Sequence, residues 1–223
     1  MNTTVHIKTN IQRIQKELPK DVILLAAVKT RTVSEVEAAY AAGIRYFGHN
    51  YIQELQAMAA RVPFKACWHV IGHLQRNKVK HAVPLADMIE SVDSLRLAKE
   101  LEKRCTAIGK IMPVLIEVNS GKEENKTGIM PNDVMELAKW ISGQAYIKLV
   151  GLMTMGPLTG DPELSRPYFK ETRRILNEIK NINIPRVNIR YLSMGMSHTY
   201  RVAVQEGANI IRLGTAIFGP RGT

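Results

Sequence analysis

The feature that most constrains the fold is an alternation of short apolar runs with helical patterns along the chain. Most runs are apolar on successive positions, as strands are when both faces of a parallel sheet are buried. We expect eight strands, at residues 22–28, 44–47, 66–71, 88–91, 111–118, 147–153, 187–192 and 210–213. Apolar residues at helical spacing and good helix formers lie between them, and predict helices at residues 34–42, 51–61, 74–82, 94–106, 132–141, 163–180 and 199–206.

Eight strand–helix units in 223 residues predict an α/β fold, namely a single (β/α)8 TIM barrel that occupies residues 1–223 as one domain. A doubly wound open sheet is the alternative, although no GxGxxG string follows the first strand. An extra helix should precede the barrel, because Ile7, Ile11, Ile14 and Leu18 have helical spacing. No composition shift or Pro/Gly-rich linker divides the chain.

Composition excludes several other classes of protein. With 45% hydrophobic residues the chain is not disordered, and Cys67 and Cys105 are too few for a disulfide scaffold and lack metal-ligand spacing. No apolar run reaches the roughly 20 residues of a membrane helix, and no signal-peptide segment is present, so we expect a soluble cytoplasmic protein with reduced thiols. The net charge of +11 allows an anionic partner, but no RNA-binding motif accompanies it, so nucleic acid is not expected.

In a barrel the active site lies at the C-terminal ends of the strands, which directs attention to a few residues. Lys29 ends the first strand, where apolar surroundings would make its amine nucleophilic; a lysine that simply reaches solvent is the alternative. Asn50 follows the second strand, as a ligand contact or a helix cap. His69 lies in the third strand, in the core or in a pocket, and Met153 in the sixth should pack.

The loops after the seventh and eighth strands have the small and hydroxylated residues typical of a barrel phosphate site. Backbone N–H groups and hydroxyls could approach an anion at Ser193, Gly195, Ser197, Gly214 and Thr215. Ser197 is also a candidate cap of the last helix. If Arg212 is buried, a ligand or a carboxylate should face it. Residues 55–86 and 179–205 contain no Asp or Glu, so we expect much of the excess positive charge around this end of the barrel.

The chain resembles one known family in seven strings taken in order: AAVKT, FGHNYIQE, WHVIGHLQRNK, ENKTGI, GLMTM, LSMGMS and IRLGTAIFG. They resemble motifs of the pyridoxal phosphate homeostasis protein family, which is related to the N-terminal barrel of alanine racemase. The resemblance covers residues 24–219 and implies a fold-type III barrel that holds pyridoxal 5′-phosphate (PLP). Two strings depart from the family pattern, with His49 where it has Glu and His73 where it has Pro; we expect these changes to remove negative charge or add basic potential near the barrel mouth.

The resemblance also implies roles for individual residues. Lys29 would bind PLP as a Schiff base and Arg212 would face the pyridine nitrogen. Ser193, Gly214 and Thr215 would hold the phosphate, with Gly195 and Ser197 in the same loop, while the pocket would be lined by Asn50, His69 and Met153. Lys126 would lie near the entrance. Because arginine stays charged, it leaves the ring nitrogen unprotonated, which suits a carrier or a racemase better than a transaminase.

The implied function is to carry or buffer PLP in vitamin B6 and amino-acid homeostasis, without established catalysis. A PLP-dependent amino-acid racemase of the alanine racemase type is the alternative. That alternative is disfavoured because few residues follow the eighth-strand motif, too few for the β-rich second domain of alanine racemase. We expect a monomer that binds PLP, no metal, and PLP-dependent apoenzymes as possible recipients.

Overall fold

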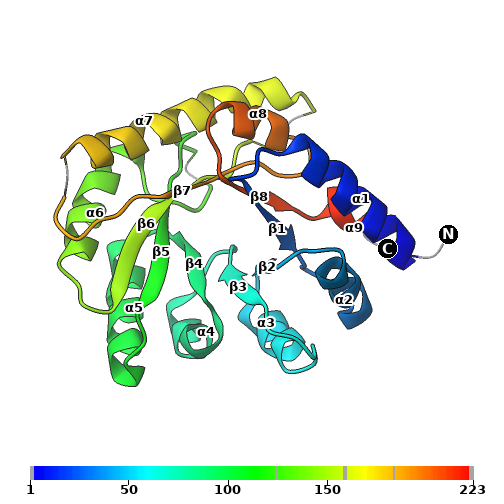
Figure 1. The fold of residues 1–223 in the computed structure, drawn as a ribbon. Coiled ribbons are helices and arrows are strands. Elements are labelled where there is room, and N and C mark those ends of the chain that lie inside the picture. The colour runs from blue at the N-terminus through cyan, green and yellow to red at the C-terminus, as the bar shows by residue number, and fades with distance from the viewer. Residues whose placement is uncertain (1–2, 124, 158–159, 183, 221–223) are drawn as a thin grey trace.

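Eight parallel strands close into a barrel in chain order, with the last strand paired to the first (Figure 1). The computed structural model describes residues 3–123, 125–157, 160–182 and 184–220. The strands are β1 (Ile23–Ala27), β2 (Tyr46–His49), β3 (Cys67–Val70), β4 (Met88–Val92), β5 (Met112–Glu117), β6 (Ile147–Met153), β7 (Tyr191–Ser193) and β8 (Ile210–Leu213). The predicted TIM barrel is confirmed, and the open doubly wound sheet is wrong.

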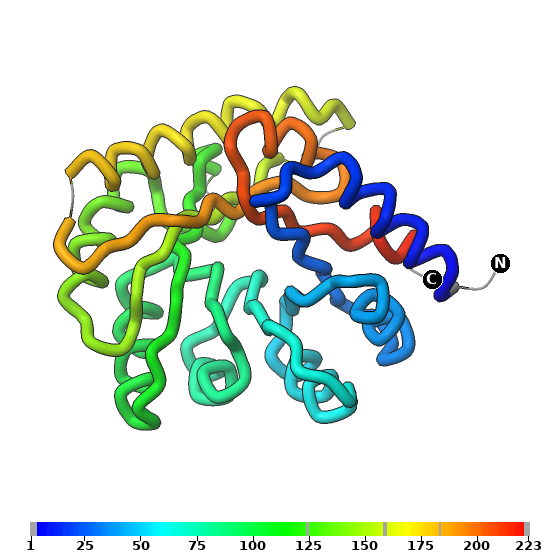
Figure 2. Tube along the Cα trace, in the orientation of Figure 1, coloured from blue at the N-terminus to red at the C-terminus, as the bar shows by residue number. Residues whose placement is uncertain are grey.

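Helices alternate with the strands along the chain and cover the outside of the barrel (Figure 2). They are α1 (Thr3–Glu17), α2 (Val33–Ala41), α3 (Ile52–Ala59), α4 (Val79–Leu85), α5 (Leu95–Ile108), α6 (Val134–Ser142), α7 (Arg166–Ile182), α8 (Tyr200–Gln205) and α9 (Thr215–Phe218), with short 3₁₀ helices η1 (Arg76–Lys78), η2 (Pro131–Asp133) and η3 (Pro162–Ser165). Within the described ranges, no helix is both long and apolar enough to cross a membrane.

The predicted extra helix is α1, which packs against α2 and α9 on the outside of the barrel. Its three isoleucines, Ile7, Ile11 and Ile14, are fully buried, as their spacing indicates. Helix α9, the last element of the barrel, lies beside α1 (Figure 1). Burial of one face of α1 therefore ties the N-terminal segment to the last element of the barrel.

Strand side chains divide between the barrel interior and a layer under the helices, as they do in any closed barrel. Leu25 and Ile71 pack together in one buried cluster, and Met88 and Met153 in another, with Tyr191 packed against both. A larger cluster includes the helix faces and outward-pointing strand residues. Met153 is fully buried, as expected for a packing residue.

The seventh strand is shorter and later than the predicted range of 187–192. A turn at Pro185 and Arg186, the latter at φ 66°, precedes it, and the Val187 N–H donates to the Ile184 carbonyl. Val187 and Ile189 pack on the core from an irregular segment. Their apolar character was therefore a signal of burial and not of strand pairing.

Two helical regions also differ from the prediction. The expected helix at 74–82 is divided into η1 and α4, and α4 continues to Leu85 with Pro84 in its last turn. Helix α9 was not predicted. It has four residues, too few to show a helical period, and begins directly after β8.

Candidate functional site

Lys29 lies at the barrel mouth, two residues after the end of β1, and is half-buried. Its Nζ atom lies 5.0 Å from the centroid of the Tyr51 ring, a cation–π contact. Among the described residues, the Lys29 amine has no hydrogen-bond or ion-pair partner. Thr30, the next residue, has φ 62°, which is strained for a β-branched side chain. Lys29 therefore presents an available amine beside a strained turn.

Arg212 lies on β8, in register with Leu25 of the neighbouring β1 and so close in space to the end of the strand that carries Lys29. Its side chain is buried, with Nη1 donating to Ser193 Oγ at 2.6 Å and Nη2 donating to the Thr154 carbonyl at 2.8 Å. The other guanidinium N–H groups have no partner among the described residues. Burial lowers the pKa of Arg212, but arginine stays protonated at neutral pH.

Glu90, in the middle of β4, is a buried charge that the sequence analysis missed. One carboxylate oxygen lies 2.5 Å from His69 Nδ1, and the other accepts from Ser193 Oγ at 2.5 Å. Burial opposes charge on His69, but its contacts with Cys67 and Glu90 outweigh this and raise the pKa of His69 to about 9. Hydrogen bonds thus connect His69, Glu90, Ser193 and Arg212 across the barrel. The sequence feature that could have identified Glu90 is the presence of one acidic residue within an otherwise mostly apolar strand.

The loops after β7 and β8 lie together, as the sequence predicts. Gly195 has φ 93°, and a Cβ there would lie 2.6 Å from the Ala203 Cβ, so the turn requires glycine. Ser197 Oγ accepts from the Ala216 N–H at 3.1 Å, which joins the two loops directly. Ser197 therefore serves α9; the expectation that it caps α8 is wrong, because Thr199 is the residue preceding that helix. Gly214 and Thr215 form the start of α9.

Asn50 and His73 lie in adjacent loops after β2 and β3 and line a cavity of about 320 Å³ with Lys78. Gly72 packs against the backbone of Asn50, where a Cβ would lie only 2.7 Å from the Asn50 Cα. The exposed His73 contacts Asp93 through Nδ1 at 2.8 Å. Separately, Lys126 forms an exposed ion pair with Glu123 at 2.6 Å.

His49 lacks the negative charge of a carboxylate but adds no positive charge of its own. It is the last residue of β2, is 1% exposed, and lines a cavity of about 300 Å³ together with Val33 of α2 and Met58 of α3. Neither ring nitrogen has a hydrogen-bond partner among the described residues, and the Glu54 carboxylate oxygen lies 4.0 Å from Nδ1. Burial lowers the pKa of His49 to about 4, so its ring is neutral at pH 7.

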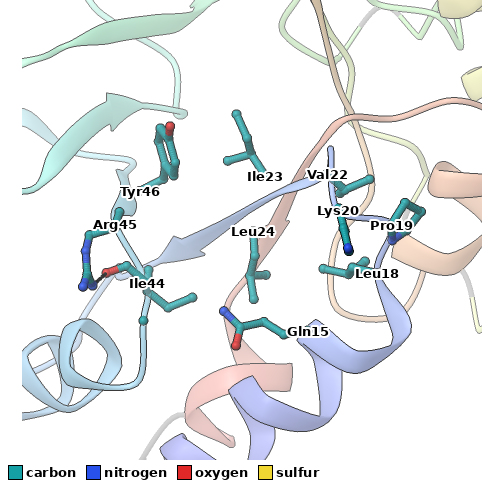
Figure 3. A pocket seen from close by; sticks show the side chains of 11 residues that line it. Gln15, Leu18, Pro19, Lys20, Val22, Ile23, Leu24, Ile44, Arg45 and Tyr46 are labelled. Carbon is teal, nitrogen blue, oxygen red and sulfur yellow. Dashed lines mark hydrogen bonds between the residues drawn. The ribbon is translucent and has the colours of Figure 1, made fainter.

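Some of the positive charge lies at the other end of the barrel from the expected phosphate site. Arg186 donates to the Gln144 carbonyl just before β6, and Arg190 directly precedes β7, so both lie at the opposite end. A cavity of about 420 Å³ at that end has Lys20 and Arg45 in its lining (Figure 3). The expectation that much of the excess positive charge surrounds the phosphate end stays a prediction, because a stretch without Asp or Glu does not specify which end of a strand its cations occupy.

Comparison with known proteins places the barrel in a defined class. Residues 4–222 match the family model described as alanine racemase, N-terminal domain. The alanine racemase of Clostridium difficile shares the fold at a TM-score of 0.79, covering 98% of this chain and 56% of its own, with 14% identity. The chain thus contains the barrel type found in alanine racemases.

More similar relatives define the family within that class. A pyridoxal phosphate homeostasis protein of Aquifex aeolicus is 37% identical over 99% of both chains. The structure of PipY from Synechococcus elongatus with PLP bound is 32% identical, has a TM-score of 0.88, and covers 96% of this chain and 100% of its own. The chain belongs to the pyridoxal phosphate homeostasis protein family.

Proposed function

We propose that this protein binds PLP through Lys29 and carries or buffers it in vitamin B6 and amino-acid homeostasis. The observation that carries the proposal is the available Lys29 amine beside β8, where the buried Arg212 retains free donors. The relative solved with PLP supports the same cofactor. When bound, PLP supplies an aldehyde that condenses with a primary amine.

The residues present fit this group in three respects. Lys29 supplies the amine, Arg212 supplies N–H donors for a ring nitrogen, and the loops joined by Ser197 supply backbone N–H groups for a phosphate. Gly195 keeps its loop free of a side chain that would displace it. We therefore assign phosphate binding to Gly195, Ser197, Gly214 and Thr215. The phosphate contact of Ser193 stays a prediction, since its hydroxyl is bonded to Glu90 and Arg212. Asn50, His69 and Met153 stay predicted contacts of the pocket.

The test is a PLP titration followed by visible absorbance. The native protein should acquire a long-wavelength band that borohydride abolishes, and Lys29→Ala should acquire none while remaining folded by circular dichroism. A native protein that stays colourless with excess PLP would overturn the proposal. Exchange of the α-hydrogen of amino acids in D₂O, lost in Lys29→Ala, would show instead that the protein is a racemase or related enzyme.

The single-domain organisation, the monomeric state and delivery to apoenzymes are also proposals. A monomer would sediment as a species of 25.0 kDa with and without PLP. To test delivery, the rate at which the loaded protein activates a PLP-dependent apoenzyme is compared with the rate at which it releases PLP to a trapping reagent. Delivery predicts that activation is faster than release. Equal rates would contradict delivery without affecting PLP binding.

A further inference from the structure

We propose that Glu90 is a positioning residue that fixes the Arg212 guanidinium for the cofactor, acting through the Ser193 hydroxyl. The inference rests on the proposed function, since it concerns how the protein prepares Arg212 for PLP. Glu90 is fully buried, and both its carboxylate oxygens are engaged, one by His69 and the other by Ser193, each at 2.5 Å. No other carboxylate among the described residues forms a hydrogen bond with Ser193.

The direction of the hydrogen bonds follows from the donors available. A hydroxyl has one hydrogen, and an ionised carboxylate can only accept, so Ser193 must donate to Glu90. Its lone pairs are then directed away from Glu90, and one accepts from Arg212 Nη1 at 2.6 Å. The Thr154 carbonyl accepts from Nη2 at 2.8 Å. Two acceptors on different nitrogens fix both the position and the plane of the guanidinium.

Placing Ser193 between the two charges has a chemical consequence. A carboxylate in direct contact with arginine commonly takes two of its N–H groups in a bidentate pair. Here the Ser193 hydroxyl separates the Glu90 carboxylate from the Arg212 guanidinium. Glu90 still compensates the buried positive charge, and the guanidinium keeps its other donors free for a ligand. Glu90 is therefore more than the ion-pair partner of His69, because its second oxygen also holds the hydroxyl that contacts Arg212.

His69 holds Glu90 in its ionised, acceptor-only form. Burial opposes that ionisation, but the hydrogen bond and charge of His69 outweigh it and keep the pKa of Glu90 below its usual value. The groups that face the imidazole are Glu90 from β4, Cys67 on the same strand, at 3.5 Å from Nε2, and the Tyr46 ring from β2. The Glu90 carboxylate thus has two partners: His69 keeps it ionised, and Ser193 connects it by hydrogen bonds to Arg212.

Three carboxylate and hydroxyl variants separate this role from a structural one. Glu90→Gln and Ser193→Ala should each weaken PLP binding about tenfold, the scale on which a supporting residue affects a group bound by its neighbour, and each should shift the visible PLP band. Glu102→Gln is the matched control. Its carboxylate accepts from the Ala145, Tyr146 and Ile147 N–H groups at the far end of β6, so it should lose stability and keep native PLP affinity.

The double variant Glu90→Gln/Ser193→Ala decides whether the two residues act as one unit. If Glu90 acts through Ser193, the double variant should bind PLP no more weakly than either single variant. Multiplied losses would overturn the proposal, as would native affinity and an unshifted band in Glu90→Gln. NMR of the His69 ring gives a second readout: its pKa should fall in Glu90→Gln and stay near the native value in Ser193→Ala.

If Glu90→Gln does not fold, Glu90→Asp replaces it. The shorter side chain keeps the charge beside His69 but cannot span both of its present partners, so PLP binding should still weaken by a comparable factor. Native affinity in this variant would overturn the proposal. Absence of PLP binding by the native protein would overturn the proposed function itself, so the two failures are distinguishable.

Discussion

At the scale of single residues, the buried His49 makes the stability of the protein depend on pH. The unfolded chain takes up a proton at this side chain near its ordinary pKa of 6.5, whereas the folded protein takes it up only near 4. The unfolded state therefore binds more protons between these values. By linkage, the free energy of unfolding falls as the pH drops from 6.5 to 4.

We expect this loss to reach about 3 kcal/mol, since each pKa unit corresponds to about 1.4 kcal/mol. His49→Gln carries no titrating group and should be less sensitive to acid over this window. Urea unfolding of both proteins at pH 7 and pH 4 measures the difference, and the exposed His81→Gln is the control. Parallel acid losses in native protein and His49→Gln would contradict the neutral, buried ring.

At the scale of the elements, the turn after β7 brings the last two strand ends together. Gly195→Ala should destabilise the protein by about 3 kcal/mol, from about 1 kcal/mol of positive-φ strain and about 2 kcal/mol of overpacking against Ala203. It should also weaken PLP binding, because the loop that carries Ser197 would move.

Gly109→Ala is the matched control for that variant. Gly109 has φ 65° at the end of α5, and a Cβ there has no atom within 4 Å, so only the strain should be lost. Denaturant unfolding should give a cost near 1 kcal/mol and unchanged PLP affinity. Equal effects of the two glycine variants would show that the close approach at Gly195 does not matter.

Elements with long apolar runs could be predicted from the sequence. An element whose start depends on a turn, or one too short to show a pattern, could not. Strand β6 matches the predicted range of 147–153, because all of its seven residues except Lys148 are buried. Strand β7 was misplaced because the turn at Arg186 delays pairing until Tyr191, while Val187 and Ile189 pack without it. Helix α9 was too short to have a pattern.

The same contrast applies to the site. Lys29, Gly195 and Arg212 stand out from sequence because each is an unusual residue type at a strand end or in a strand. The partner of Arg212 could not be read in this way, because Glu90 and Ser193 are 103 residues apart and meet only when the barrel closes. Long-range polar contacts depend on register, which local patterns do not specify.

At the scale of the whole molecule, PLP binding should stabilise the barrel by mass action. A ligand at 100 times its dissociation constant adds about 2.7 kcal/mol to the free energy of unfolding when it binds only the folded state. Tm should therefore rise by several degrees with saturating PLP, and Lys29→Ala should show a much smaller rise at the same concentration. Equal shifts would indicate that the phosphate alone accounts for binding.

The central claim, that Lys29 holds PLP covalently at the barrel mouth, is tested most directly by locating the bond. Borohydride reduction of the PLP-loaded protein, proteolysis and peptide mass spectrometry should place the phosphopyridoxyl group on Lys29 at one group per chain. Label spread over exposed lysines such as Lys80, or absent from the Lys29 peptide, would contradict the account.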